Sequence, residues 1–160
     1  MPSQKKGLNA ILQAGLLAGS LDIITACVQY YVVTGKNPLK VLNFIASGLL
    51  GKEALGKGVY VNEWWLPVTG LLLHFVIAFS FTVFFYWVYP LIRAVAKNRT
   101  ITGLLYGIFV WCVMNLAVLP LVMGAKFPSD WWKAAQSMLI LMVMIGLPIS
   151  FIIGKYYDRK

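Results

Sequence analysis

The sequence predicts an all-α integral membrane protein, in which a single domain over residues 1–160 forms a bundle of four transmembrane helices. Of the 160 residues, 60% are hydrophobic and only 12% are charged, whereas about 25% are charged in a typical soluble domain. The apolar residues also fall into four long runs, each longer than the ~20 residues that a helix needs to cross a bilayer. These runs cover about 8–33, 66–89, 101–123 and 134–154.

The first run follows Lys5 and Lys6 and is longer than the 7–15 apolar residues of a signal-peptide core, so we expect a retained helix. Small and polar residues recur along it at spacings of three and four, which places them on one face. Small residues at this spacing let membrane helices approach closely, so this face should point into the bundle. The residues of the face are Gly15, Gly19, Asp22, Ala26 and Gln29.

The segment after the first run predicts a short amphipathic helix over about 38–55, with Pro38 as a suitable first residue. It is too short to span the bilayer and should lie on its outer surface. We interpret it as a linker that dips into lipid; the alternative is a lid over the bundle. Its two faces carry Leu42, Ile45, Ala46 and Leu49 on one side and Lys40, Asn43 and Ser47 on the other.

The other three runs carry similar stripes, which should meet inside the bundle while Leu, Ile, Val and Phe face lipid. We expect Pro120 and Pro148 to bend their helices locally. The stripes are Gly70, His74 and Ala78 in the second run, Gly103, Gly107, Trp111 and Asn115 in the third, and Gly146, Ser150 and Gly154 in the fourth.

Two pairs of similar stretches suggest an internal repeat. The sequence reads NEWWLP at 62–67 and SDWWKA at 129–134, and a GLLxG motif occurs at 15–19 and at 103–107. They predict two hairpins of the same topology, as in parallel membrane repeats, although chance recurrence is an alternative. Asn62 and Ser129 should cap the helices that follow. The tryptophans Trp64, Trp65, Trp131 and Trp132 should anchor the outer interface.

The net charge of +9 indicates a membrane orientation and no nucleic-acid partner, because the basic residues flank the apolar runs. Basic residues gather more densely on the side that holds both termini, so the termini should be cytoplasmic. That side has eight of the 14 Lys and Arg residues, namely Lys5, Lys6, Arg93, Lys97, Arg99, Lys155, Arg159 and Lys160.

Three polar residues within the runs form the candidate site. Asp22, His74 and Asn115 each lie eight or nine residues from the outer helix end, which is ~12–14 Å at 1.5 Å per residue. They can therefore meet, and Gln29 would extend the polar path outward. An intramembrane carboxylate is unfavourable by at least ~2.5–3.5 kcal/mol, so it is usually paired, protonated or functional. Two interpretations stay open: a hydrogen-bonded cluster that fixes helix register, or a ligand, ion or proton site.

The sequence predicts no catalytic residues, no metal site and no cofactor, so we do not expect an enzyme. A single histidine excludes a bis-histidine haem, and the two cysteines form no Cys/His cluster for zinc.

The second and third runs resemble the YagU-like group of small bacterial inner-membrane proteins. The residues concerned are LLLHFVIAFSFTVFFYWVYP at 71–90, a short basic loop, and GLLYGIFVWCVMNLAVLPL at 103–121. The resemblance covers about sixty residues and implies a bacterial cytoplasmic membrane. It implies no particular chemistry.

We therefore expect a small membrane protein, surrounded by lipid, whose polar pocket binds or passes a small solute or a proton. Four helices are few for alternating access, so transport would require a homo-oligomer. The alternative is a non-catalytic accessory subunit that packs against a larger membrane complex.

Overall fold

The computed structural model describes residues 2–51, 64–96, 98–124 and 130–158, and within these ranges the chain is built from helices and short connections. Four helical stretches are long and apolar enough to cross a membrane, which confirms the predicted four-helix membrane bundle. In chain order the elements are α1 (Pro2–Thr34), α2 (Leu39–Leu50), α3 (Trp65–Val95), α4 (Arg99–Cys112), η2 (Val113–Val118), α5 (Leu119–Met123), α6 (Trp131–Leu141), η3 (Met142–Gly146) and α7 (Leu147–Asp158).

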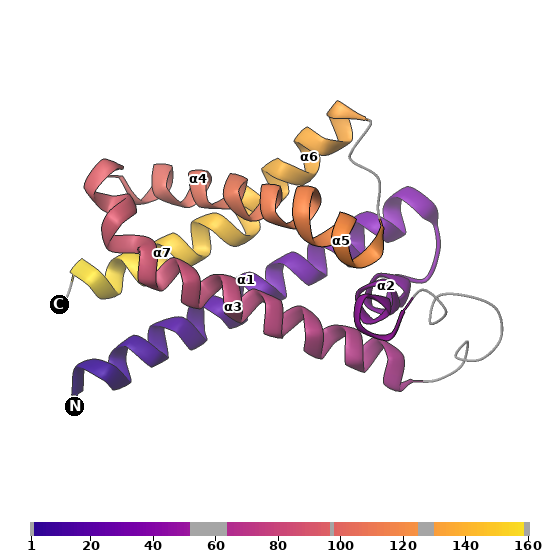
Figure 1. Cartoon of the computed structure of the whole chain (residues 1–160), viewed down its shortest axis with the longest axis horizontal. Coiled ribbons are helices and arrows are strands. Elements are labelled where there is room, and N and C mark those ends of the chain that lie inside the picture. Colours follow the sequence, from indigo (N-terminus) through magenta and orange to yellow (C-terminus); the bar gives the residue numbers. More distant parts are fainter. Residues whose placement is uncertain (1, 52–63, 97, 125–129, 159–160) are drawn as a thin grey trace.

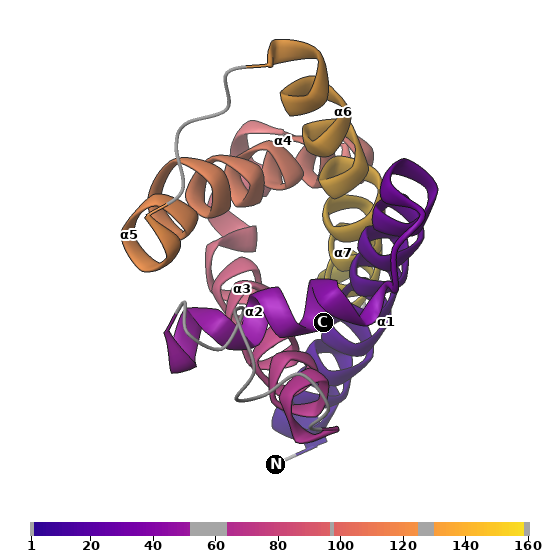
Figure 2. The ribbon, with the colours of Figure 1, turned by 90° about the vertical axis from the view of Figure 1, so that its right-hand side faces the viewer.

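Both termini lie at one end of the bundle, together with the connection from α3 to α4, and α2 and α5 lie at the other (Figure 1). The first span, α1, packs against α3 and α7, and α4 packs against α6, η3 and α7. From the α3–α4 connection the two helices diverge, so α5 ends well away from α3. Viewed along the bundle, the four spans surround a central region, and α2 crosses its near end (Figure 2).

Several helices are longer than predicted. The first begins at Pro2 rather than near residue 8, and α3 continues through Pro90 to Val95 instead of ending at residue 89. Proline is tolerated inside membrane helices because neighbouring groups satisfy the backbone carbonyl that it leaves free. The short helix α2 ends at Leu50, where Gly51 adopts a φ of 87°. Its predicted extension to residue 55 lies largely outside the described residues.

The two prolines expected to bend their helices each follow a π-helical turn. Proline has no N–H and its ring clashes with the carbonyl four residues earlier, which disturbs the regular hydrogen bonding. Just before Pro120, the N–H of Leu119 donates to the carbonyl of Met114, five residues back. Before Pro148, the N–H of Leu147 donates in the same way to Met142. The local distortion is therefore a wider helical turn within the third and fourth spans.

The predicted small-residue stripes lie inside the bundle. A Cβ on Gly15 would collide with Phe79 of α3 and one on Gly19 would make a tight contact with Phe75, so the first GLLxG motif faces the next span. The second motif, at 103–107, likewise faces the next span, through η3. The stripe of α1 leaves the interior before Gln29, which is exposed. Duplication of a hairpin stays a prediction.

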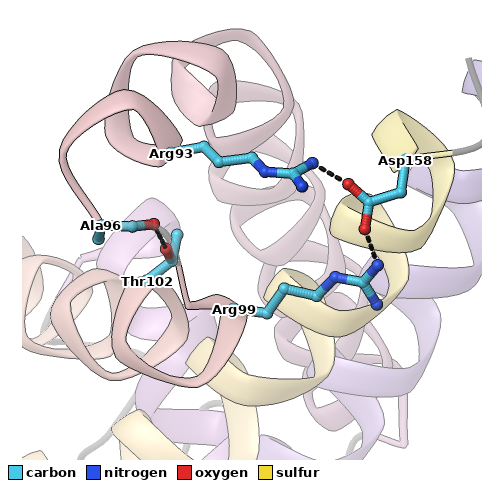
Figure 3. Close-up of polar contacts among 5 residues, drawn as sticks. All are labelled: Arg93, Ala96, Arg99, Thr102 and Asp158. Carbon is cyan, nitrogen blue, oxygen red and sulfur yellow. Dashed lines mark hydrogen bonds and ion pairs between the residues drawn. The ribbon is translucent and has the colours of Figure 1, made fainter.

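A network of ion pairs holds the helix ends beside the termini (Figure 3). Asp158, at the end of α7, pairs with Arg93 of α3 and with Arg99 of α4. Ser150 donates to the carbonyl of Arg99 at 2.7 Å, and Thr102 donates to that of Ala96 at 3.1 Å. These contacts join three spans where α3 turns into α4. At the opposite end of the bundle, α3 and α5 lie apart (Figure 1).

Candidate intramembrane binding site

A cavity of about 440 Å³ lies where α3 and α5 diverge. Every span contributes to its wall, and α2 covers it at the end away from the termini. Its polar lining residues are Asp22, His74 and Asn115, the three residues that the sequence predicted to meet. The rest of the lining is Ala18, Gly19, Phe44, Ile45, Gly48, Leu49, Leu73, Ile77, Ala78, Phe81, Val110, Met114, Val118, Leu119, Val122, Leu141, Ile145 and Ile149.

The cover of the cavity depends on close contact between α2 and α3. A Cβ on Gly70 of α3 would lie 1.9 Å from the carbonyl oxygen of Leu42, so the backbone of α2 crosses α3 directly at this glycine. Leu42 and Ala46 are buried in the contact, and so is Ser47, which the sequence placed on the polar face. One face of α2 is therefore docked on the bundle, while Leu39, Phe44, Leu49 and Leu50 stay exposed. The two interpretations of this segment, a linker that dips into lipid and a lid over the bundle, both stay predictions.

Asp22 lies on α1, half-buried, one turn beyond the close contact that Gly19 makes with α3. In the described part of the chain, no hydrogen bond reaches its carboxylate from a side chain or a backbone group. It does interact electrostatically with His74. The carboxylate therefore faces the cavity with its acceptor oxygens available.

His74 lies on α3, and its Nε2 is 2.8 Å from the carbonyl oxygen of Gly19 on α1. A carbonyl oxygen only accepts hydrogen bonds, so Nε2 carries the proton and donates. In a neutral imidazole the second nitrogen, Nδ1, is then an acceptor. This bond connects α1 to α3 and orients the ring. It also uses the donor that a direct bond from Nε2 to Asp22 would need.

Asn115 projects from the π-helical segment η2. Its Nδ2 donates to the carbonyl of Trp111 at 3.1 Å, and a flipped amide would instead place two acceptor oxygens together. The acceptor Oδ1 is left for the cavity. Trp111 is itself held by a hydrogen bond from Nε1 to Ser137 of α6, at 2.8 Å. A π-helical turn at this depth is a frequent feature of functional sites.

The fourth predicted site residue, Gln29, does not line the cavity. It lies on α1 nearly two turns beyond Asp22, on an exposed position. The predicted outward extension of the polar path through this side chain was therefore wrong. The stripe that contains it turns away from the bundle as α1 passes the level of α2.

Three of the four predicted interface tryptophans are strongly exposed: Trp64 by 78%, Trp131 by 82% and Trp132 by 73%. The fourth, Trp65, packs against the buried pair Ala46 and Leu66 where α2 meets α3.

Asp130 caps α6 by accepting hydrogen bonds from the backbone N–H groups of Trp132 and Lys133. The predicted caps at Asn62 and Ser129 lie outside the described residues.

Sequence reasoning missed the part of the wall that comes from α2. Phe44, Ile45, Gly48 and Leu49 all line the cavity. The available signal was the apolar face of this amphipathic segment, which was assigned to lipid. No group of three or more His, Cys, Asp or Glu side chains in the described residues is arranged to hold a metal ion.

No protein-family model, curated protein or solved structure matches this chain. The chemical character of the cavity therefore has to come from its own residues.

Proposed function

We propose that this protein binds a small, largely apolar molecule inside the membrane, in the cavity between α3 and α5. The observation that carries the proposal is the cavity itself. It has a volume of about 440 Å³, largely apolar walls and three polar lining residues, Asp22, His74 and Asn115. Ligand sites typically have volumes of about 300–1,000 Å³, mostly apolar linings and a few polar groups that orient the ligand.

The arrangement of the polar residues supports a ligand site over a purely structural cluster. A structural cluster would satisfy its members mutually, but His74 bonds to Gly19 and Asn115 to Trp111. The Asp22 carboxylate accepts no hydrogen bond within the described residues. Buried polar groups normally have partners. A bound molecule would supply the missing one.

The alternative, an accessory subunit of a larger complex, receives less support. Such a subunit should carry glycine stripes that face outward, ready for a partner helix. Every glycine within the four candidate spans instead lies against atoms of this chain. The described spans therefore keep their close-packing surfaces for one another.

The same proposal places the protein in the bacterial cytoplasmic membrane with both termini in the cytoplasm. The basic residues described at the termini end support the orientation, since basic residues favour the cytoplasmic side. They are Lys5, Lys6, Arg93, Arg99 and Lys155. Passage of the solute across the membrane would require a homo-oligomer, since four helices leave little material for alternating access.

Binding can be tested by ¹⁹F NMR with 4-(4-fluorophenyl)butan-1-ol added to the protein in phosphatidylcholine nanodiscs. We expect a resonance that is absent from empty nanodiscs and that saturates. Ile77→Phe should abolish it, because Ile77 lines the cavity and is only half-exposed. Val76→Phe is the matched control, since Val76 is the neighbouring residue and is 61% exposed. Equal spectra for the two variants would refute the proposed site.

A further inference from the structure

The polar atoms that the described lining offers to a ligand are dominated by hydrogen-bond acceptors. Nε2–H of His74 donates to Gly19, and one of the two N–H groups of Asn115 donates to Trp111, which leaves Oδ1 and one N–H of that amide. An ionised Asp22 has acceptor oxygens only, and none of them receives a hydrogen bond from the described residues. A ligand that complements this carboxylate must therefore bring donors.

The charges of the lining residues point the same way. Among the described lining residues, Asp22 is the only acidic one, and none is Lys or Arg. The described basic residues with known ion-pair partners lie elsewhere: Arg93 and Arg99 pair with Asp158, and Lys133 pairs with Asp130. Among the described lining residues, His74 alone can share a positive charge with this carboxylate, and its Nε2–H is already bonded to Gly19.

We propose that the cavity binds an organic cation with N–H donors on an apolar body, such as a protonated primary amine, with Asp22 as its counter-ion. The ammonium group supplies up to three donors, enough for the two carboxylate oxygens of Asp22 and for Oδ1 of Asn115. Hydrogen bonds between an ammonium and a carboxylate are charge-assisted and are among the stronger ones in proteins. The inference rests on the proposed function and specifies the ligand class.

The opening of the cavity fits an amphiphile. Two lining residues are strongly exposed: Leu49 of α2 by 67% and Val122 of α5 by 53%. They belong to the apolar outer surface of a chain that spans the membrane. The apolar body of the ligand would lie along these residues, while its ammonium group reaches inward to Asp22.

The test compares four molecules that share one apolar body, titrated into the nanodisc protein at pH 7 by ¹⁹F NMR. They are 4-(4-fluorophenyl)butylamine, its N,N,N-trimethyl derivative, the corresponding alcohol and 1-butyl-4-fluorobenzene. The amine has charge and donors, the trimethyl derivative has charge alone, the alcohol has a single neutral donor, and the last molecule has neither. Neutral phosphatidylcholine limits attraction of the cations to lipid, and Ile77→Phe gives the background.

We expect the amine to bind about tenfold or more tightly than the trimethyl derivative and the alcohol, as a charge-assisted hydrogen bond should provide. Asp22→Asn should remove most of this preference, because the amide keeps the shape of the side chain but not its charge. Thermal unfolding of the variant, compared with the wild type, shows whether it is folded.

Equal affinities of the wild type for the amine, the alcohol and 1-butyl-4-fluorobenzene would overturn the cation assignment while leaving the proposed cavity intact. The cation assignment would also be overturned if the trimethyl derivative bound with the same affinity as the amine, since the N–H donors would then contribute nothing to binding. Failure of all four molecules to bind above the Ile77→Phe background would refute the proposed function itself. The wild-type comparison decides the matter even if Asp22→Asn does not fold.

Discussion

Gly103 of α4 and Gly146 of η3 bring the backbones of two spans into direct contact. A Cβ on Gly146 would lie 2.1 Å from the carbonyl oxygen of Gly103, and one on Gly107 would lie 2.3 Å from the Cα of Met142. No side-chain movement can relieve these contacts, because the colliding atoms belong to the backbone. The close packing of the third and fourth spans therefore requires glycine at these positions, because any larger side chain would push the two backbones apart.

Gly146→Ala should destabilise the protein by about 1–3 kcal/mol, the usual range for overpacking, because α4 and η3 must move apart. Alanine otherwise favours a helix over glycine by up to about 1 kcal/mol, so a loss of stability identifies the steric effect. Thermal unfolding in detergent measures it. Gly15→Ala is the comparison and should cost less, since its Cβ meets only the ring of Phe79. If Gly146→Ala proves as stable as the wild type, the spans are not held by this contact.

The ion pairs of Asp158 should make a small, salt-dependent contribution to stability. Its side chain is 27% exposed and those of Arg93 and Arg99 are 42% and 33% exposed, so solvent screens the pairs. We expect Asp158→Asn to reduce stability by about 0.5–1 kcal/mol per pair at low salt. The loss should shrink at 1 M salt, where the screening length falls to about 3 Å.

A double-mutant cycle with Arg93→Gln and Asp158→Asn isolates the first pair, and one with Arg99→Gln isolates the second. Coupling that stays unchanged at high salt would mean that the contact acts through packing instead of charge.

Asp130 should make the start of α6 sensitive to acid. The backbone N–H of Lys133, followed by the side chain of that lysine and the N–H of Trp132, holds the pKa of the carboxyl group below its usual value. A lowered pKa in the folded state means that the carboxylate stabilises the fold above the pKa of the unfolded chain, about 3.9. This stabilisation is lost as pH falls through the folded pKa.

Asp130→Ala should therefore lower the melting temperature at pH 6 by about 1–3 °C, and the difference from the wild type should narrow near pH 2. Asp130→Asn keeps a capping oxygen without the charge, so its deficit at pH 6 should be smaller than that of Asp130→Ala. This deficit should also narrow as pH falls, because the wild-type carboxylate then loses its charge. A pH-independent deficit for Asp130→Ala would exclude the carboxylate charge as the cause.

Much of the architecture could be predicted from the sequence because the bilayer imposes simple rules. A spanning helix must satisfy its own backbone and be about 20 residues long, so composition and run length locate the spans. The level of each polar residue follows from the helical rise, which is why Asp22, His74 and Asn115 were expected at one depth. The structure places all three at one cavity.

The hydrogen-bond partners within the cavity could not be predicted, because they depend on how helices cross. His74 donates to Gly19, 55 residues away in sequence, at a position set by the crossing of α1 and α3. The π-helical turns arise from Pro120 and Pro148, but a proline alone does not distinguish a kink from a wider turn. The docking of α2 depends on Gly70, which in the sequence is one glycine among several with the same spacing.

Gly70→Ala should detach α2 from α3 and expose the cavity. Its Cβ would lie 1.9 Å from the carbonyl oxygen of Leu42, so the two backbones must separate by more than any rotamer change could absorb. The spans themselves do not depend on this contact, and only Leu42, Ala46 and Ser47 of α2 are buried. We therefore expect faster hydrogen exchange in residues 39–50, unchanged exchange in α4 and α7, and about tenfold weaker binding of the fluorinated alcohol.

The matched control is Thr69→Ala, which removes the neighbouring hydroxyl. This hydroxyl donates to the carbonyl of Trp65 in its own helix. If exchange in α2 rises while binding is unaffected, α2 is not the wall that retains the ligand, and the lining supplied by the four spans must suffice.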